Sequence, residues 1–313
     1  MKDIKGKTYL LLAFSLAGTS VVTGRFLSGK LGSFTITAVS LGLLLICLSP
    51  FYAARTMETI RRLKATDWKM LMLQALFGIF LFRAFLLSGV NLTSAAEAGM
   101  LTGAAPAVTS LLAFFFLKES LSKKTVLGIG CTVIGIVLLQ GINLDGAAFS
   151  IRHFWGNALV LCAAASESVF NVISRKQGAS SQSRQQIHPM VQTLLVSAFS
   201  FVLCLVPAFL ESPVASIKKA GLMEWSALAW YGLIVTALAF VSFYAGVKRC
   251  DAYTTAAFSG MMPLTSLLLS VLLLNEGISL DQLAGGFLII SGMLLIRGKP
   301  AVEERRKAHP VNN

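Results

Sequence analysis

Residues 118–124 have the sequence KESLSKK, and residues 275–281 have the sequence NEGISLD. The two stretches lie 157 positions apart and keep glutamate and serine at matching places, Glu119 with Glu276 and Ser122 with Ser279. The first stretch carries three lysines and the second carries none. Cytoplasmic loops of membrane proteins collect Lys and Arg. The difference in charge therefore predicts one turn built twice, once on each side of a membrane.

The repeat extends well beyond these turns. The same shift of 157 residues aligns 67–141 with the second half of the chain without a gap, and the matched positions include Trp68 with Trp225, Gly103 with Gly260, Pro106 with Pro263, Gly128 with Gly285 and Gly135 with Gly292. A weaker match relates the first apolar segment to the sixth. Equivalent residues are five crossings apart, and because five is odd, the two copies must run in opposite directions. Inverted repeats of this kind are typical of secondary transporters, which bind substrate between the halves.

Composition places the chain in the membrane. Of its 313 residues 55% are hydrophobic and 13% are charged, and the mean hydropathy is +0.74. Soluble proteins carry about 25% charged residues, so the composition argues against a soluble enzyme. A membrane-spanning helix needs roughly 20 apolar residues. The apolar runs predict ten spans, an all-α membrane protein, at 8–28, 33–53, 68–90, 94–117, 123–142, 154–174, 189–210, 225–247, 252–275 and 279–296.

The charges predict an orientation. Of the 27 Lys and Arg, 21 fall in the loops and termini on the side of the N-terminus, four fall on the opposite side, and Arg25 and Arg83 lie within spans. This asymmetry predicts that both termini face the cytoplasm in a multi-pass protein of the cell membrane. It also accounts for the net charge of +13 without a nucleic-acid partner. The expected partners are the lipid bilayer, a small-molecule substrate and protons.

The sequence lacks the motifs of several common kinds of nucleotide, metal and cysteine chemistry. The sequence contains no G-x-x-x-x-G-K-[ST] phosphate loop and no H-E-x-x-H, and its five cysteines form no C-x-x-C pair. We therefore expect no metal site, no cofactor and no ATP hydrolysis within the chain. An intramembrane enzyme would need a nucleophile and a base, or clustered metal ligands, at matching depth, and the candidates are scattered. A receptor or scaffold would be expected to carry a signalling domain or a long tail.

The repeated segments resemble the ten-helix EamA-type branch of the drug/metabolite transporter superfamily. The resemblance is carried by 93–101, Pro106 and the run ending at Glu119, and again by 253–257, Pro263 and 274–276. It implies a five-helix repeat over 1–145, an inverted copy over 153–298 and a cytoplasmic tail over 299–313. It also implies a central cavity among spans 1, 3, 4, 6, 8 and 9. Members of this branch export amino acids, metabolites or drugs, and related branches move nucleotide sugars.

Glu167 is the clearest candidate for function. A charged side chain within a span costs about 2.5–3.5 kcal/mol on insertion scales, so its presence needs a reason. Glu167 lies near the middle of the sixth expected span, and Asn171 follows one turn later on the same face. It could carry a proton or bind a substrate amine. The alternative is a paired or neutral structural glutamate.

Three more ionisable residues are candidates for the substrate and proton pathway. Arg83 and Arg25 could bind a carboxylate or phosphate, although Arg25 lies close enough to the interface to extend its charge into water. Glu97 could join that pathway, pair with either arginine, or form a capping box with Ser94. Pro106 and Pro263 are expected to bend their spans at equivalent places and expose backbone.

These features together predict a secondary active transporter that works by alternating access. We expect proton-coupled efflux of small metabolites, amino acids or drug-like compounds. An importer or exchanger of a small organic anion or a nucleotide-sugar-like solute is the alternative within the same class. An intramembrane enzyme or a receptor is the alternative from another class.

Overall fold

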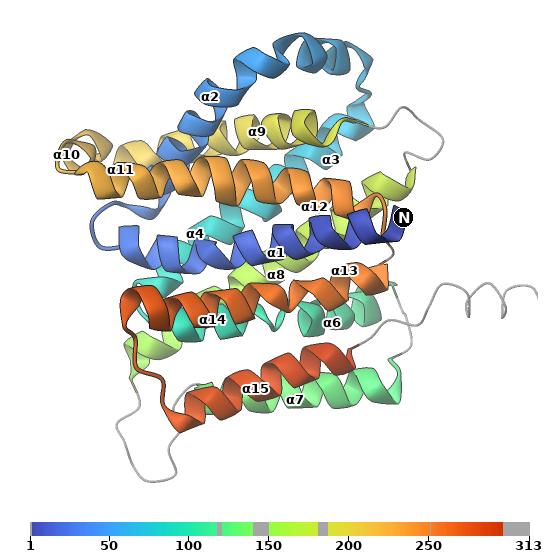
Figure 1. Ribbon diagram of the computed structural model, residues 1–313, viewed down its shortest axis with the longest axis vertical. Helices are drawn as coiled ribbons and strands as arrows, with labels where there is room; N and C mark the ends of the chain where they lie inside the picture. Colours follow the sequence, from blue (N-terminus) through green and yellow to red (C-terminus); the bar gives the residue numbers. More distant parts are fainter. Residues whose placement is uncertain (1, 118–120, 140–149, 181–186, 251, 297–313) are drawn as a thin grey trace, which may run out of the picture.

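The computed structural model describes residues 2–117, 121–139, 150–180, 187–250 and 252–296. Within these ranges the chain is helical and forms no strand. Glu119, residues 140–149 near the junction of the two expected repeats, and the expected tail over 299–313 lie outside the described residues. Six crossings of the bundle are made by single helices, α1 (Lys2–Leu27), α2 (Ser33–Arg62), α7 (Lys123–Leu139), α8 (Ile151–Ser180), α9 (Pro189–Leu210) and α15 (Leu280–Leu295) (Figure 1).

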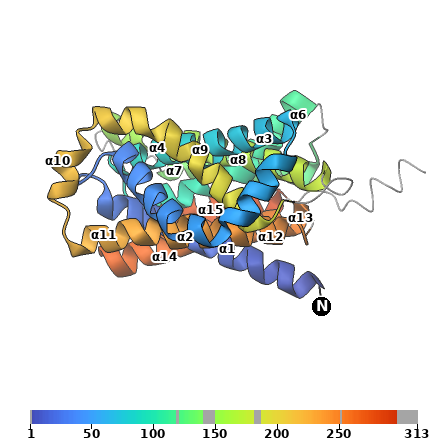
Figure 2. The same ribbon diagram turned by 90° about the horizontal axis from the view of Figure 1, so that it is seen from above.

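Other segments expected as single spans are interrupted. Two contain a π-helical stretch: α3 (Ala65–Ala75), η1 (Leu76–Leu81) and α4 (Phe82–Val90) in the first, and α11 (Leu222–Ala229), η2 (Trp230–Leu238) and α12 (Ala239–Val247) in the second. Two are broken into α5 (Ala95–Thr102) with α6 (Ala105–Leu117), and α13 (Ala252–Ser259) with α14 (Met261–Leu274). A short helix, α10 (Pro213–Lys218), lies at one end of the bundle (Figure 2).

The breaks lie next to the two prolines. Pro106 is the second residue of α6 and Pro263 is the third residue of α14. Both therefore stand in the first turn of a new helix, where the missing N–H of proline leaves no intrahelical bond unmade. The bend that proline was expected to cause within a span is thus a helix break just ahead of it, at Gly103 and at Gly260.

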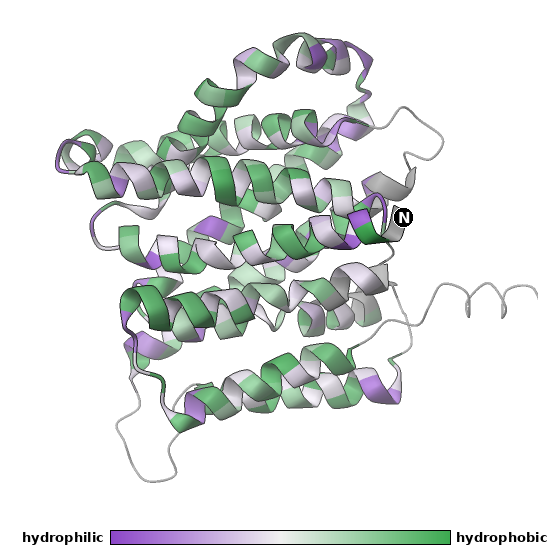
Figure 3. Cartoon of the chain, in the orientation of Figure 1, coloured by the Kyte–Doolittle hydropathy of each residue, from purple (hydrophilic) through white to green (hydrophobic). Residues whose placement is uncertain are grey.

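The surface and length of the helices suit a bilayer. In the described part of the chain six helical segments are long and apolar enough to cross a membrane, and Met261–Leu274 and Leu280–Leu295 are shorter apolar helices. Hydropathy colouring shows apolar residues along most of the helical bodies (Figure 3). Large apolar side chains are exposed on the outer faces, Phe51, Val206, Phe209 and Phe287 among them. Such a surface is stable in lipid and unfavourable in water.

The bundle has two ends that differ in charge. The basic end, on the right in Figure 1, carries the start of α1, the junction of α2 with α3, and the last residues of α12. Its described cations include Lys5, Lys7, Arg55, Arg61, Arg62, Lys64, Lys69, Lys123, Lys124, Lys248 and Arg249. The opposite end carries Lys30, Arg152, Lys218 and Lys219. Every crossing connects these two ends.

Packing follows a regular scheme. At the centre, α1 lies against α12 and α14, while α8 lies against α4, α5 and α6. On one side α2 packs on α9, and at the far side α7 packs on α15 (Figure 1). This arrangement places the middle of α1 and α8 in the interior, surrounded by the other helices.

Glycines let α7 and α15 approach closely. A Cβ added at Gly128 would lie 2.6 Å from the carbonyl oxygen of Gly292, and one added at Gly135 would lie 2.6 Å from that of Gly285. In the other direction, a Cβ added at Gly292 would lie 2.5 Å from the carbonyl oxygen of Gly128, and one added at Gly285 would lie 2.8 Å from that of Gly135. Small residues of this kind permit backbone contact between membrane helices.

Candidate functional site

A cavity of about 70 Å³ lies in the interior of the bundle. It is lined from α1, η1, α4, α8, α12 and α14 by Ala13, Phe14, Ala17, Gly78, Phe82, Glu167, Phe170, Asn171, Ala239, Phe240, Phe243 and Met262. The volume is enough for a few water molecules and is smaller than the roughly 300–1,000 Å³ of sites that hold drug-sized ligands. We call it the central cavity.

Glu167 supplies the single acidic group of the central cavity. It lies near the middle of α8, and the side chain of Asn171, one turn further on, hydrogen-bonds to its carboxyl group. The second oxygen, Oε2, is buried and has no hydrogen-bond partner among the described residues. A buried carboxylate with a free oxygen needs a proton or a cation to offset its desolvation. The geometry leaves room for either at this position.

Aromatic rings pack together on the side of the cavity that faces the basic end. The Phe170 ring centroid lies 5.4 Å from that of Phe240 and 5.4 Å from that of Phe243, and Tyr244 joins them at 6.2 Å from Phe170. From α1, Phe14 meets Phe243 edge-on at 6.0 Å. Ring separations of this size are favourable for aromatic pairs. The cluster therefore forms a packed layer between the central cavity and the basic end.

A buried amide network lies beyond this layer. Gln192 of α9 donates hydrogen bonds to Gln74 and Gln177, at 3.0 Å each, and the Tyr244 hydroxyl donates to Gln74 at 2.9 Å. Gln74 also donates to Gln177. A small cavity of about 20 Å³ adjoins these groups, and Ser174 and Lys248 help to line it. Sequence reasoning missed the network, although Gln74 and Gln192, polar residues within expected spans, were a usable signal.

Arg83 is buried outside the central cavity, between α4, α2 and η2. Its side chain bonds to the Ser40 hydroxyl of α2 at 3.0 Å and to the Thr236 hydroxyl of η2, and its guanidinium lies over the Tyr231 ring at 4.1 Å from the centroid. A longer contact of 3.5 Å reaches the Tyr231 carbonyl oxygen. The residue is 4% exposed and has no carboxylate partner within the described ranges. It does not line the central cavity.

The contacts of Arg83 with Tyr231 and Thr236 fall within the π-helical segment η2. Thr236 donates a hydrogen bond to the Tyr231 carbonyl oxygen at 2.7 Å, five residues back in the chain. A π-helical turn widens the helix and leaves carbonyl oxygens available to side chains. Arg83 therefore joins α4 to η2 and α2 through neutral acceptors and one aromatic face.

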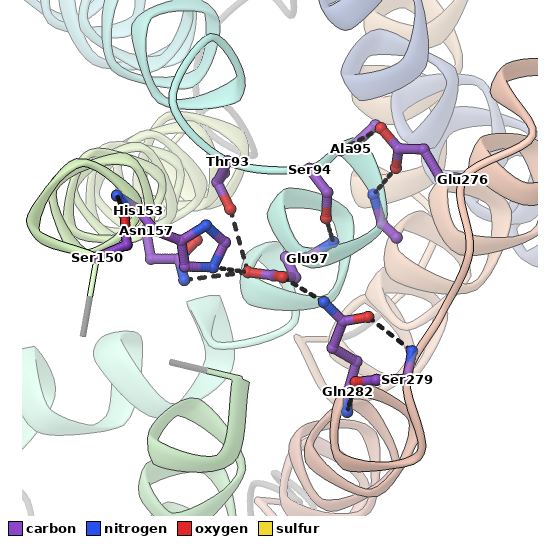
Figure 4. Close-up of polar contacts among 11 residues, drawn as sticks. Thr93, Ser94, Ala95, Glu97, Ser150, His153, Asn157, Glu276, Ser279 and Gln282 are labelled. Atoms are coloured by element: carbon purple, nitrogen blue, oxygen red, sulfur yellow. Dashed lines mark hydrogen bonds and ion pairs between the residues drawn. The ribbon is translucent and has the colours of Figure 1, made fainter. Parts of the chain in front are cut away.

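Glu97 lies at the opposite end of the bundle within a dense polar cluster (Figure 4). Its Oε2 accepts hydrogen bonds from Thr93 at 3.1 Å and Asn157 at 3.2 Å, and His153 Nε2 lies 2.6 Å away. Gln282 of α15 donates to Oε1. Glu97 is 2% exposed, and hydrogen-bond donors from α8, α15 and the turn before α5 surround its carboxyl group.

Glu97 and Arg25 do not pair with each other. Ser94 accepts a hydrogen bond from the backbone N–H of Glu97 at 3.1 Å, which caps α5, while the Glu97 side chain turns to the cluster. Arg25 bonds to the Val90 carbonyl oxygen at 2.7 Å and lies 3.8 Å from Glu276. Glu276 in turn accepts hydrogen bonds from the backbone of Ala95 and Ala96 at the start of α5 (Figure 4).

Of the residues singled out in the sequence, the structure brings Glu167 and Asn171 together at the central cavity. Arg83, Arg25 and Glu97 occupy three separate places, each with its own protein partners. Among the described residues no group of three or more His, Cys, Asp or Glu side chains is arranged to hold a metal ion.

Comparison with known proteins gives concordant matches along the whole chain. The EamA-like transporter family matches residues 4–140 and 154–298. An uncharacterized transporter of Bacillus subtilis, YetK, is 31% identical over 97% of this chain and 92% of its own length. The WAT1-related protein At5g47470 of Arabidopsis thaliana is 24% identical over 94% of this chain and 86% of its own.

A solved structure agrees in fold. The crystal structure of another protein matches this chain over 98% of both chains, with a TM-score of 0.56 and 22% sequence identity. At this level of identity the likeness concerns the fold alone.

Proposed function

The chain belongs to the EamA-like transporter family of the drug/metabolite transporter superfamily, and from that premise we propose that this multi-pass membrane protein is a proton-coupled exporter. Its substrates are small metabolites, amino acids or drug-like compounds, and it works by alternating access. The observation that carries the coupling is Glu167, whose Oε2 is buried in the central cavity without a hydrogen-bond partner. The proton would bind to this carboxyl group on one side of the membrane and leave on the other.

We propose ten crossings in two inverted five-helix repeats, over 1–145 and 153–298. The π-helical segments support this, because η1 and the later part of η2 lie 157 residues apart. The glycine contacts support it too. Gly128 meets Gly292, the equivalent of Gly135, and Gly135 meets Gly285, the equivalent of Gly128. A reciprocal contact of this form is expected when a two-fold axis relates the halves.

The proposed orientation places the basic end in the cytoplasm, with both termini there and the 299–313 tail following, in the cell membrane. The proposed transport cycle then alternates between opening at the basic end, through the aromatic layer, and opening at the opposite end. The central cavity stays at the interface of the two halves in both states.

A Glu167→Gln variant tests the proton coupling. The variant keeps the volume and the bond to Asn171 and cannot release a proton. A metabolite screen of cells that express wild type or variant identifies compounds that accumulate in the mutant. Flux of such a compound in proteoliposomes under an imposed pH gradient is then expected to fall at least tenfold in the variant.

Ser166→Ala is the matched control. Ser166 neighbours Glu167, but its hydroxyl bonds back to the Cys162 carbonyl oxygen. This variant is expected to transport as wild type does. Wild-type flux that ignores the pH gradient would refute the coupling, and gradient-driven flux that persists in Glu167→Gln would remove Glu167 from it.

A further inference from the structure

The lining of the central cavity has a chemical bias. Five phenylalanines face it from α1, α4, α8 and α12: Phe14, Phe82, Phe170, Phe240 and Phe243. Glu167 is the acidic member of the lining, and no Lys, Arg or His belongs to it. Asn171 adds a neutral amide. The cavity therefore combines aromatic faces with one carboxyl group.

Both features favour positive charge. The face of an aromatic ring carries negative electrostatic potential and attracts a cation held within about 6 Å of its centre. Quaternary and alkylated ammonium groups are commonly bound in cages of several such rings. A carboxylate with a free oxygen in the same cage adds direct charge compensation, because a buried anion is stable only when it is paired or protonated.

Arg83 does not oppose a cation here. It follows Phe82 directly in the chain, but its hydrogen-bond partners belong to α2 and η2, and the Tyr231 ring covers its guanidinium. Its repeat equivalent is Phe240, which lines the cavity. An anionic substrate would meet Glu167 and ring faces without a lining cation to receive it.

We infer that the central cavity binds a small organic cation, an ammonium group on an apolar or aromatic body, which competes with the proton for Glu167. The inference rests on the proposed function, since it names the substrate class of the same site. Because either the proton or the organic cation compensates the charge of the Glu167 carboxylate, one must leave when the other binds. Transport would then be an obligatory exchange of the two. The phenylalanines must separate to admit such a molecule, since the present volume is about 70 Å³.

Binding to purified protein in lipid nanodiscs tests the inference without transport. The probes are benzyltrimethylammonium, benzyl alcohol and benzoate, which share a ring and differ in charge. Calorimetry is expected to give at least tenfold tighter binding for the cation than for either other probe. In weak buffer, binding of the cation is expected to release protons.

Variants locate the site. Glu167→Gln is expected to lose the preference for the cation, and Glu167→Asp to keep it in part. Phe240→Leu is expected to weaken cation binding several-fold, and Phe240→Trp to restore it, because an aromatic face returns. The controls are Phe80→Leu, whose ring packs on Phe34 away from the cavity, and Glu58→Gln on the surface. Elution as a single monodisperse species verifies that each variant is folded.

The outcomes separate this inference from the proposed function. Equal binding of the three probes, or tightest binding of benzoate, would overturn the cation site even if pH-driven flux depends on Glu167. Cation binding that requires Glu167, together with flux that ignores the pH gradient, would sustain the site and refute the coupling. A cation preference that persists in Glu167→Gln would also overturn the inference.

Discussion

Two buried charges illustrate how individual residues differ in this protein. Arg83 and Glu167 both lie in helices in the interior of the bundle, where an isolated charge is costly. Arg83 is held by neutral acceptors and the Tyr231 ring, and it lines no described cavity. Glu167 has one bond to Asn171 and a free oxygen in a cavity. Arg83 therefore contributes to packing among α2, α4 and η2, and Glu167 is the residue on which the proposed exchange rests.

Arg83→Lys is expected to lower stability. Lysine cannot stack its flat group on Tyr231 or reach the Ser40 and Thr236 hydroxyls together. Loss of such contacts typically costs about 1–3 kcal/mol when buried partners are left unsatisfied. Thermal unfolding in detergent micelles measures the effect. The comparison is Arg25→Lys, at a side chain that is 39% exposed, and an equal response of the two variants would contradict this assignment.

His188 gives a prediction about pH. It caps α9 by accepting the Met190 N–H on Nδ1 at 3.3 Å. Partial burial, followed by the nearby cations Arg55 and Lys248, lowers the pKa of His188. The unfolded chain gains a proton on this group as pH falls through about 6.5, whereas the folded chain resists it, so His188 reduces stability below that pH.

The variant His188→Asn isolates this effect. Asparagine also caps a helix and does not titrate. Unfolding midpoints measured from pH 8 down to pH 5 are expected to fall less steeply in the variant than in wild type. Parallel pH profiles would show that His188 contributes nothing to the dependence.

At the scale of elements, hydropathy located the helices well and their interruptions poorly. The run expected over 189–210 is α9 with the same bounds, because an apolar stretch between polar residues marks a buried span. The π-helical segments were not predicted from the sequence, and in η2 the residues Tyr231 and Thr236 contact Arg83, which lies 148 and 153 positions away in the chain. The cap of α5 by Glu276 comes from 181 positions away.

One part of the candidate site could be predicted from the sequence and another part could not. Glu167 and Asn171 could be paired from their spacing on one helix, because residues four apart share a face. The Gln74–Gln177–Gln192 network and the phenylalanine lining could not be paired in this way. The network joins α3, α8 and α9, the lining joins α1, α4, α8 and α12, and the relative placement of these helices is a property of the fold.

Gly135→Ala tests the contact of α7 with α15. The new methyl group would lie 2.6 Å from the Gly285 carbonyl oxygen, so the helices must separate. Overpacking of this kind costs about 1–3 kcal/mol. Gly130→Ala on the same helix is the matched control, because nothing lies within 4 Å of its added Cβ. It should leave stability unchanged or raise it by up to about 1 kcal/mol. Equal losses in both variants, measured by unfolding in micelles, would count against the contact.

At the scale of the whole molecule, the protein is a bundle with a basic end, an opposite end that carries few cations, and an interior cavity between them. The aromatic layer and the amide network lie between the cavity and the basic end. The Glu97 cluster ties α5, α8 and α15 at the opposite end. Polar contacts that the proposed opening would have to break are therefore present at both ends.

Cysteine labelling tests the proposed orientation. Lys219→Cys and Lys124→Cys, each in a chain without its native cysteines, place one thiol at each end of the bundle. A membrane-impermeant thiol reagent is expected to label Lys219→Cys in intact cells, and Lys124→Cys only after permeabilisation. The reverse pattern would invert the orientation, and labelling of both in intact cells would contradict an arrangement with separate sides.

The reciprocal glycine contact has a consequence for how a duplicated chain diverges. Where α7 and α15 touch, a larger side chain on either helix would collide with the backbone of the other, and all four positions hold glycine. Away from that seam, equivalent positions answer to different neighbours, and one half has Arg83 where the other has Phe240. In the proposed duplication, likeness is thus required at this helix contact and is not required elsewhere, so that Phe240, which lines the central cavity, can differ from its equivalent Arg83, which does not.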